Sequence, residues 1–462
     1  MSFFIVFSLK WAKVFVMQYA KVSNTYSSIW KISFPIVIGL VAQNLMMVID
    51  TAFLGRLGEV SLGSAAIGGL MHLTLVMLGT GFGIGMQILI GRRNGEGNYR
   101  VIGRLFDHGV YLLVVLSIFL FTIVSLFGEV FLDHFIESQA VLQESKRFVE
   151  YRRFGFFVGM LNIAFTSFFV GIVKTRVVMG ATVIMAISNI FLNYILIFGK
   201  LGFPEMGISG AALATNISES VALVFYLSNV LIFKYKDRFR LFKFQKAHRK
   251  LYSKIFTIAG PVMLQYFIAF SAWFAFFLVL ERLGETALAA SNITRSIYMF
   301  LMIPVWGLSS ATTTLISNII GQGRKDEVMK MFKKIVLISI LSNLVFVQSI
   351  IFFPSEIVSV FTNDAALIAA TIPILRVVTL ALIVFSAGMI AFSTLSGTGK
   401  TTLALKVEII AIAFYLGLAF FFSSLENATV QMVWFVEVFY FGIMGLAALF
   451  FIKRGSWKKL QV

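Results

Sequence analysis

The chain has 462 residues, of which 59% are hydrophobic and only 13% are charged. A soluble globular protein carries about 25% charged residues, so this composition, with 51 phenylalanines, excludes a soluble fold and indicates a polytopic membrane protein. The net charge of +18 is typical of Lys and Arg in cytoplasmic loops, and we expect no nucleic-acid binding. Cysteine is absent, which excludes disulfides and thiol chemistry.

Residues 1–21 contain an apolar run that is too short to span a bilayer, and they lack the small-residue cleavage site of a signal peptide. Two interpretations stay open for them. They form an interfacial helix with its lysines at the headgroups, or they extend upstream of a start at Met17. We assign residues 1–28 to a cytoplasmic or interfacial segment.

Apolar runs long enough to cross a bilayer, about 20 residues each, follow along the rest of the chain. All are expected to be helices, because open sheet edges are not tolerated in lipid. The predicted spans are 29–54, 62–90, 105–127, 148–172, 177–198, 207–233, 254–280, 288–319, 332–353, 366–395, 402–422 and 428–452. We therefore predict an all-α protein of about twelve transmembrane helices. Its N-lobe is 29–233, its C-lobe is 254–452, and a basic linker (234–253) and tail (453–462) are cytoplasmic.

Basic residues follow every second span. The even-numbered loops carry Arg92, Arg93, Arg100, Arg104, Arg324, Lys325, Lys330, Lys333 and Lys334, besides the linker and the tail. The loops between them are neutral or acidic, so the positive-inside rule places both termini in the cytoplasm. We expect a multi-pass protein of the plasma or inner membrane. The linker is read as a solvated connection between the lobes.

The two halves of the chain are repeats of each other at one constant offset in the sequence. "FLGRLGEVSLGSAAI" at 53–67 aligns with "VLERLGETALAASNI" at 279–293, and Pro35 aligns with Pro261. Six spans is an even number, so both copies enter from the same side and the repeat is parallel. The same offset aligns Lys174 with Lys400 in "SGTGKTTLAL", a stretch that imitates a phosphate-binding loop. The spacing of its glycines is wrong for such a loop, and we predict a tight turn between two spans.

The first span carries the first candidate site residue, Asp50, which aligns with Phe276 in the other half. A charge inside a span is costly and is a functional hypothesis by default. Helical spacing places Gln43, Met47 and Asp50 on one broad inward face. The alternative is that Asp50 lies near the outer end of the helix and there only reaches water or caps the turn.

Four more polar residues lie in two pairs at helical spacing, so that each pair shares one face of its own helix. Asn189 and Asn193 are four residues apart, as are Thr215 and Glu219, and Glu219 lies near mid-membrane. Their oxygens suit a hard cation or a shuttled proton, so all four join Asp50 as predicted cation ligands. The alternatives are hydrogen bonding between helices for the asparagines and a buried structural pair for Glu219.

The seventh predicted span has an aromatic face at the positions that align with the inward face of the first span. Aromatic faces attract cations, so we predict that a substrate contacts Gln265, Trp273 and Phe276 on this span. Gln43 and Met47 on the first span are predicted to contact the same substrate. The alternative is packing between the lobes. Lys406, Glu408 and Glu437 are further intramembrane charges without an assigned role. The four histidines form no ligand cluster, so we predict no transition-metal site and no cofactor besides a coupling ion.

These features together resemble the multidrug and toxic compound extrusion (MATE) family, from about Ser28 to the end of the chain. The motifs that carry the resemblance are "VIDTAFLGRLG" with "LVLERLGE", "IGRRNGEG" with "IIGQGRKDE", "VKTR" with "GTGKTT", and "NIFLNYILIFGKLGFPEMGISGAALAT". The wording is nearest the NorM-type branch. The resemblance implies two six-helix lobes around a central cleft and export of organic compounds in exchange for Na⁺ or H⁺.

Position by position, Asp50 matches the family's first-helix aspartate, and Asn189 and Thr215 match polar positions of the N-lobe cation site in one branch. That branch has a second aspartate where this chain has Asn193. The NorM-type and eukaryotic branches have a glutamate on the seventh helix where this chain has Ala269. The NorM-type aspartate on the tenth helix is also absent, with Phe385 near its position. Ion coupling is therefore expected in the N-lobe, with Glu219 as our own candidate for the second carboxylate.

The resulting prediction is a secondary active multidrug efflux antiporter, not an enzyme, that exports organic and often cationic compounds in exchange for H⁺ or Na⁺ and works as a monomer. The alternative within transport is a lipid-linked oligosaccharide flippase of the same superfamily. That alternative favours a cationic cavity for pyrophosphate, whereas the charged residues of the predicted cation site, Asp50 and Glu219, are acidic.

Overall fold

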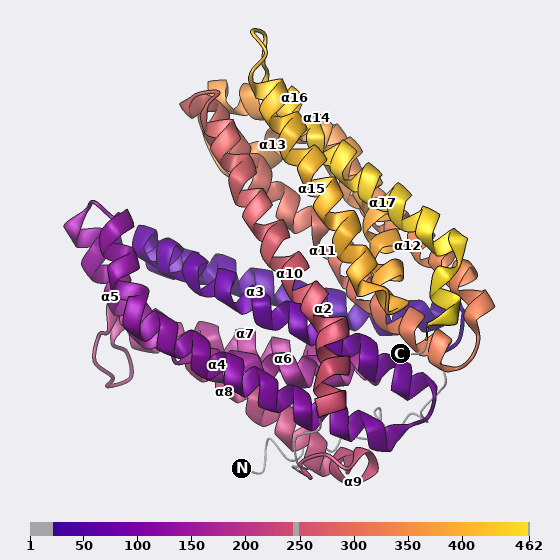
Figure 1. Cartoon of the computed structure of the whole chain (residues 1–462). Coiled ribbons are helices and arrows are strands. Elements are labelled where there is room, and N and C mark those ends of the chain that lie inside the picture. Colours follow the sequence, from indigo (N-terminus) through magenta and orange to yellow (C-terminus); the bar gives the residue numbers. More distant parts are fainter. Residues whose placement is uncertain (1–21, 244–248, 461–462) are drawn as a thin grey trace.

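The computed structural model describes residues 22–243 and 249–460, and every regular element in those residues is helical (Figure 1). The interfacial segment predicted at residues 1–21 lies outside them. The first half contains α2 (Tyr26–Gly55), α3 (Glu59–Gly95), α4 (Tyr99–Phe135), α5 (Gln139–Arg152), α6 (Gly155–Gly171), α7 (Thr175–Phe198), α8 (Gly207–Ile232) and the short α9 (Tyr235–Phe239). The predicted all-α architecture is confirmed.

The second half has a similar order. It contains α10 (Arg249–Glu281), α11 (Glu285–Gly321), α12 (Val328–Phe352), α13 (Pro354–Ser359), α14 (Ala365–Gly397), α15 (Thr401–Ser423), α16 (Val430–Trp434) and α17 (Val436–Arg454), with 3₁₀ turns at Lys325–Glu327 and Ser456–Lys459. It differs in that the single helix α14 occupies the positions that correspond to α5 and α6. Helices α3 and α11 begin and end at positions separated by the offset that relates Pro35 to Pro261, and the starts of α7 and α15 are separated by the same offset. The structure thus carries the same repeat that the sequence shows.

Polar caps set several helix ends within this apolar sequence. The Thr25 hydroxyl accepts a hydrogen bond from the Ser28 amide (3.2 Å) at the start of α2, and Asp364 Oδ1 accepts one from the Ala366 amide (2.8 Å) at the start of α14. Such caps satisfy amides that have no partner within the helix. The residues after α14 form the turn predicted from "SGTGKTT": α14 ends at Gly397, α15 begins at Thr401, and Gly399 has a φ of +90°.

The prediction of a single helix over the fourth span, 148–172, is wrong. These residues span two helices, α5 and α6, which meet at an angle of 50°. With this bent pair taken as one span, the described residues contain twelve candidate membrane spans. Gly155, the first residue of α6, lies against the guanidinium of Arg152, and a Cβ there would lie on top of the arginine Nη1. A glycine at this position therefore leaves room for Arg152 to turn back toward α8.

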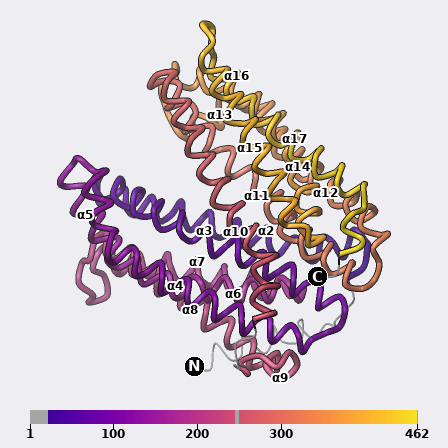
Figure 2. The backbone as a smooth tube through the Cα atoms, viewed as in Figure 1, coloured from indigo at the N-terminus to yellow at the C-terminus, as the bar shows by residue number. Residues whose placement is uncertain are grey.

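The helices form two lobes that meet at one end and diverge toward the other (Figures 1 and 2). We call the end where they meet the basic end, because it carries Arg92, Arg93, Lys174, Arg324 and Lys400. Several hydrogen bonds join the lobes there. Arg92 Nη2 donates to the Thr398 carbonyl (2.9 Å), and Gln87 Nε2 donates to the Thr314 hydroxyl (2.8 Å). At the opposite end, α5 of one lobe and α16 of the other lie well apart (Figure 1).

The first part of the linker does not extend freely into solvent. Helix α9 buries Tyr235 and Phe239, and the backbone amides of Phe242 and Lys243 donate to the two carboxylate oxygens of Asp107 on α4 (2.9 and 3.0 Å). This part of the predicted solvated linker is therefore anchored to the N-lobe.

Close contact between α3 and α10 at the basic end depends on a small residue. A Cβ on Gly85 would lie 2.4 Å from Cα of Ala259, closer than real Cβ contacts come. Gly85→Val is therefore expected to separate the lobes at this end. Thr314 is buried at the interface between the lobes, and the chain has no cysteine, so Thr314→Cys introduces a single thiol that reports on opening. We expect this thiol to be labelled at least about tenfold faster in the Gly85→Val protein than in the protein that keeps Gly85, because separation of the lobes exposes it.

Gly63→Val is the matched control, because a Cβ at this position on the same helix meets nothing within 4 Å. Equal labelling of the reporter in the Gly85→Val and Gly63→Val proteins would contradict the close-packing argument.

Candidate ion-binding site

Asp50 lies near the C-terminal end of α2, in the half of the helix where the lobes diverge. Its side chain is only partly exposed and contacts α7. Asn193 Nδ2 donates to Asp50 Oδ1 at 2.5 Å. The helical register of α2 thus directs the only carboxylate of this helix toward the polar face of α7.

A chain of polar contacts runs on from Asp50. Asn193 Nδ2 also donates to Asn189 Oδ1 (3.1 Å), and Asn189 Nδ2 donates to the Thr215 hydroxyl (3.4 Å) on α8. The Thr215 hydroxyl donates to the Ala211 carbonyl (3.0 Å). The structure therefore brings together four of the five predicted cation ligands in one connected group, drawn from three helices.

This group is hidden from solvent in its deeper part. Asn189 and Asn193 are 0% and 1% exposed. Both amide hydrogens of Asn193 are used, and its Oδ1 is buried without a hydrogen-bond partner in the described part of the chain. A buried acceptor without a partner is costly, and a cation or a proton donor at this oxygen would satisfy it. The arrangement thus has unfilled capacity for a positive ligand.

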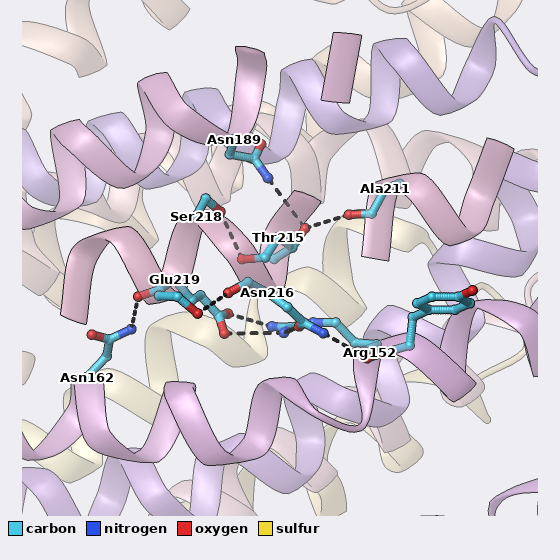
Figure 3. A network of polar contacts seen from close by, with 10 residues as sticks. Arg152, Asn162, Asn189, Ala211, Thr215, Asn216, Ser218 and Glu219 are labelled. Carbon is cyan, nitrogen blue, oxygen red and sulfur yellow. Dashed lines mark hydrogen bonds and ion pairs between the residues drawn. The ribbon is translucent and has the colours of Figure 1, made fainter. Parts of the chain in front are cut away.

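Glu219, the fifth predicted ligand, has a different partner. Arg152 Nη2 donates to Glu219 Oε1 at 2.6 Å, and Nη1 donates to Oε2 at 3.3 Å and to Asn216 Oδ1 at 2.5 Å. Asn162 Nδ2 donates to the backbone carbonyl of Glu219 (2.9 Å), and Figure 3 shows these side chains converging from α5, α6 and α8. The carboxylate that we proposed as a second ligand is thus already balanced by a guanidinium.

The predicted substrate contacts are spread over different environments. Gln43 and Met47 are exposed on α2, and Trp273 is half-buried on α10. Gln265 is buried at 5% exposure, and its Nε2 has no hydrogen-bond partner in the described residues. Phe276 is 0% exposed and packs on Tyr415 and Trp434, with ring centroids 5.2 and 5.4 Å away. The structure places Phe276 in the core of the C-lobe and not on a surface open to a ligand.

A protein-family model described as MatE matches residues 35–195 and again 261–421. The chain belongs to the MatE family. The two matches have the same length and are separated by the offset that relates Pro35 to Pro261, so they support the repeat independently. Members of this family are transporters, and the MatE chain is accordingly a transporter and not an enzyme.

Relatives of this MatE chain share its length. A protein of Thermotoga maritima named "Probable multidrug resistance protein NorM" is 25% identical over 440 residues, which cover 94% of this chain and 93% of that protein. A protein of Pasteurella multocida with the same name is 24% identical over 343 residues, 73% of each chain.

Solved structures show the same fold. One, titled "Outward-facing conformation of a multidrug resistance MATE family transporter of the MOP superfamily", aligns with a TM-score of 0.86 at 21% identity and covers 94% of this chain and 96% of that one. Another, of a transporter from Pyrococcus furiosus whose title describes a binding pocket of reverse polarity, aligns with a TM-score of 0.87 at 21% identity over the same shares. The two-lobed fold with parallel repeats is confirmed.

Sequence reasoning did not identify Arg152 and Asn216 as neighbours of Glu219. A signal for Arg152 existed, because it lies inside the predicted span 148–172, where a basic residue usually pairs with an acid. The bend between α5 and α6, which the apolar pattern does not reveal, is what directs Arg152 toward Glu219.

Proposed function

We propose that this protein is a secondary active multidrug efflux antiporter that exports organic, often cationic compounds in exchange for H⁺ or Na⁺. The observation that carries the proposal is Asp50. It is a carboxylate within a membrane span, it forms no ion pair with a basic side chain in the described residues, and it ends a buried chain of amides and a hydroxyl. The names of the full-length relatives, which describe multidrug resistance proteins, support the cargo class.

We infer that the basic end faces the cytoplasm of a plasma or inner membrane, because excess Lys and Arg mark cytoplasmic loops. Under this orientation the lobes are closed on the cytoplasmic side and diverge toward the outside, and Asp50 lies in the outer half of α2. An ion arriving from outside then meets Asp50 first, and a substrate between the lobes is released to the same, outer side.

The coupling follows from competition between two states of the lobes. A positive ion at Asp50 favours the state that has released a cationic substrate, and the substrate favours the state in which the ion has left. The ligand set is a carboxylate, two amides and a hydroxyl, and these oxygens suit either a proton or a hard monovalent cation. The substrate contacts expected on α2 and α10 are Gln43, Met47, Gln265 and Trp273.

Efflux of ethidium from pump-deficient bacteria that express the chain tests this function under imposed H⁺ or Na⁺ gradients. We expect efflux that follows one gradient, which then identifies the ion. A folded, well-expressed protein that moves no ethidium under either gradient contradicts the proposal. In that case lipid-linked oligosaccharide is the cargo to test next.

A further inference from the structure

Two carboxylates lie buried inside the C-lobe, away from the Asp50 group. Glu408 on α15 is 4% exposed and Glu437 on α17 is 3% exposed. Both lie within helices that are long and apolar enough to cross a membrane. Burying an ionised carboxylate in such surroundings is costly unless a counter-charge or a proton accompanies it.

Tyrosines surround both carboxylates. The Tyr415 hydroxyl donates to Glu437 Oε1 at 2.9 Å, and the Tyr298 hydroxyl lies 3.4 Å from Glu437 Oε2. The Tyr440 hydroxyl donates to Glu408 Oε1 at 2.5 Å. The rings of Tyr415 and Tyr440 lie 5.2 Å apart between centroids, so one aromatic pair joins the two carboxylates. Hence the two acids and their tyrosines form one cluster, contributed by α11, α15 and α17.

No basic side chain neutralises this cluster among the described residues. Neither glutamate forms an ion pair there, and Lys406, two residues before Glu408, is exposed. The other groups that face it are tyrosines, with Tyr266 contributed by α10. Arg295 on α11 lies over the Phe277 ring, and Arg376 on α14 is exposed.

One oxygen of the cluster has no partner at all. Glu408 Oε2 is buried and accepts no hydrogen bond in the described part of the chain. A negative charge shared onto this oxygen would have no protein donor to stabilise it, whereas a proton on it removes the charge. This unpaired oxygen of Glu408 therefore indicates a proton as the ligand.

The internal repeat places this cluster at the counterpart of the Asp50 group. At the offset that relates the two halves, Phe276 corresponds to Asp50 and Tyr415 corresponds to Asn189. Phe276 packs on Tyr415, much as Asp50 and Asn189 are joined through Asn193. The C-lobe thus lacks an acid at the position of Asp50, but it has a carboxylate in contact with Tyr415.

We propose that Glu408 and Glu437, with their tyrosine donors, form a second proton-binding site inside the C-lobe. Its role in transport rests on the proposed antiport, while proton binding itself does not. A metal ion fits this cluster poorly, because three hydroxyl hydrogens already point at the carboxylates. Among the described residues, no three His, Asp or Glu side chains are placed to hold a metal. Tyr440, which is half-buried, is the member of the cluster that reaches the protein surface.

Infrared spectroscopy of the purified full-length protein in lipid tests the site directly, because a protonated carboxyl group has its own carbonyl stretching band. We expect this band at neutral pH in the parent and in Asp50→Asn, with a decrease toward alkaline pH. Glu408→Gln and Glu437→Gln should each remove one component. Tyr415→Phe should shift the frequency of the Glu437 component, since it deletes a hydrogen bond to that group.

Three spectroscopic results would overturn the proposal. One is an absent band, the second is a band unchanged in both glutamine variants, and the third is a band that stays constant across pH, which would indicate permanently protonated structural acids. Glu426→Gln is the matched control, because Glu426 is exposed in the turn after α15 and its loss should leave the spectrum unchanged. If one glutamine variant does not fold, the other variant and Tyr440→Phe still decide the outcome.

Transport in liposomes then tests coupling. Under a gradient of one pH unit, each coupled proton supports a drug gradient of up to about tenfold, so Glu408→Gln should lower the steady-state drug gradient by up to about tenfold. A parent that moves no drug contradicts the proposed function and leaves the infrared result valid. If the parent moves drug and both Glu408→Gln and Glu437→Gln sustain the same drug gradient as the parent, the second site has no role in coupling. That result leaves the proposed role of Asp50 unchanged.

Discussion

Replacing Asp50 by asparagine is expected to remove the ion coupling that Asp50 supplies while leaving the protein folded. Asparagine has the same shape, and its oxygen still accepts the hydrogen bond from Asn193 Nδ2, so the packing of α2 on α7 should persist. The charge that binds H⁺ or Na⁺ is lost. Under a tenfold ion gradient each coupled ion supports a drug gradient of up to about tenfold, so the drug gradient should fall by up to about tenfold relative to the parent. Ethidium efflux in proteoliposomes measures the loss.

Glu59→Gln is the control for this prediction. It removes the same charge from an exposed residue at the start of α3, just after the turn that follows α2, and efflux should equal that of the parent. Drug binding to the Asp50→Asn protein should remain measurable, because the defect lies in coupling. Ion-driven efflux by Asp50→Asn at the rate of the parent would exclude Asp50 as the coupling site.

The fold follows from the sequence because its signals are local and repeated. Each span is an apolar run of bilayer length, and the constant offset between the two halves predicts that α3 and α11 have matching ends. The same reasoning failed between residues 148 and 172. The break there depends on Gly155 and on where Arg152 points, and hydropathy does not register either of them.

The candidate site was only partly predictable, for a related reason. Helical spacing could place Asn189 beside Asn193 and Thr215 near Glu219, since residues four apart share a face. It could not pair Glu219 with Arg152, which is 67 residues away on a helix whose direction depends on the bend. Nor could it give Glu408 and Glu437 a role, because the tyrosines that contact them lie on three helices.

Replacing Arg152 by glutamine is expected to destabilise the protein strongly. The two side chains of the Arg152–Glu219 pair are 12% and 15% exposed, and removal of one partner leaves the other charge buried and unpaired, at a cost of about 3–5 kcal/mol. The double variant Arg152→Gln/Glu219→Gln should recover most of this loss, since neither charge remains. Thermal unfolding of the purified full-length protein gives all three values of the double-mutant cycle.

The matched control lies on the same helix. Arg147 pairs with Glu144 at 2.9 Å, but its side chain is 64% exposed, and Arg147→Gln should cost no more than about 1 kcal/mol. If Arg152→Gln costs as little as Arg147→Gln, the buried pair is not a structural element. The double variant also separates the two interpretations of Glu219. A purely structural pair leaves the ion dependence of efflux unchanged when both charges are removed, whereas a second cation ligand at Glu219 requires that dependence to weaken.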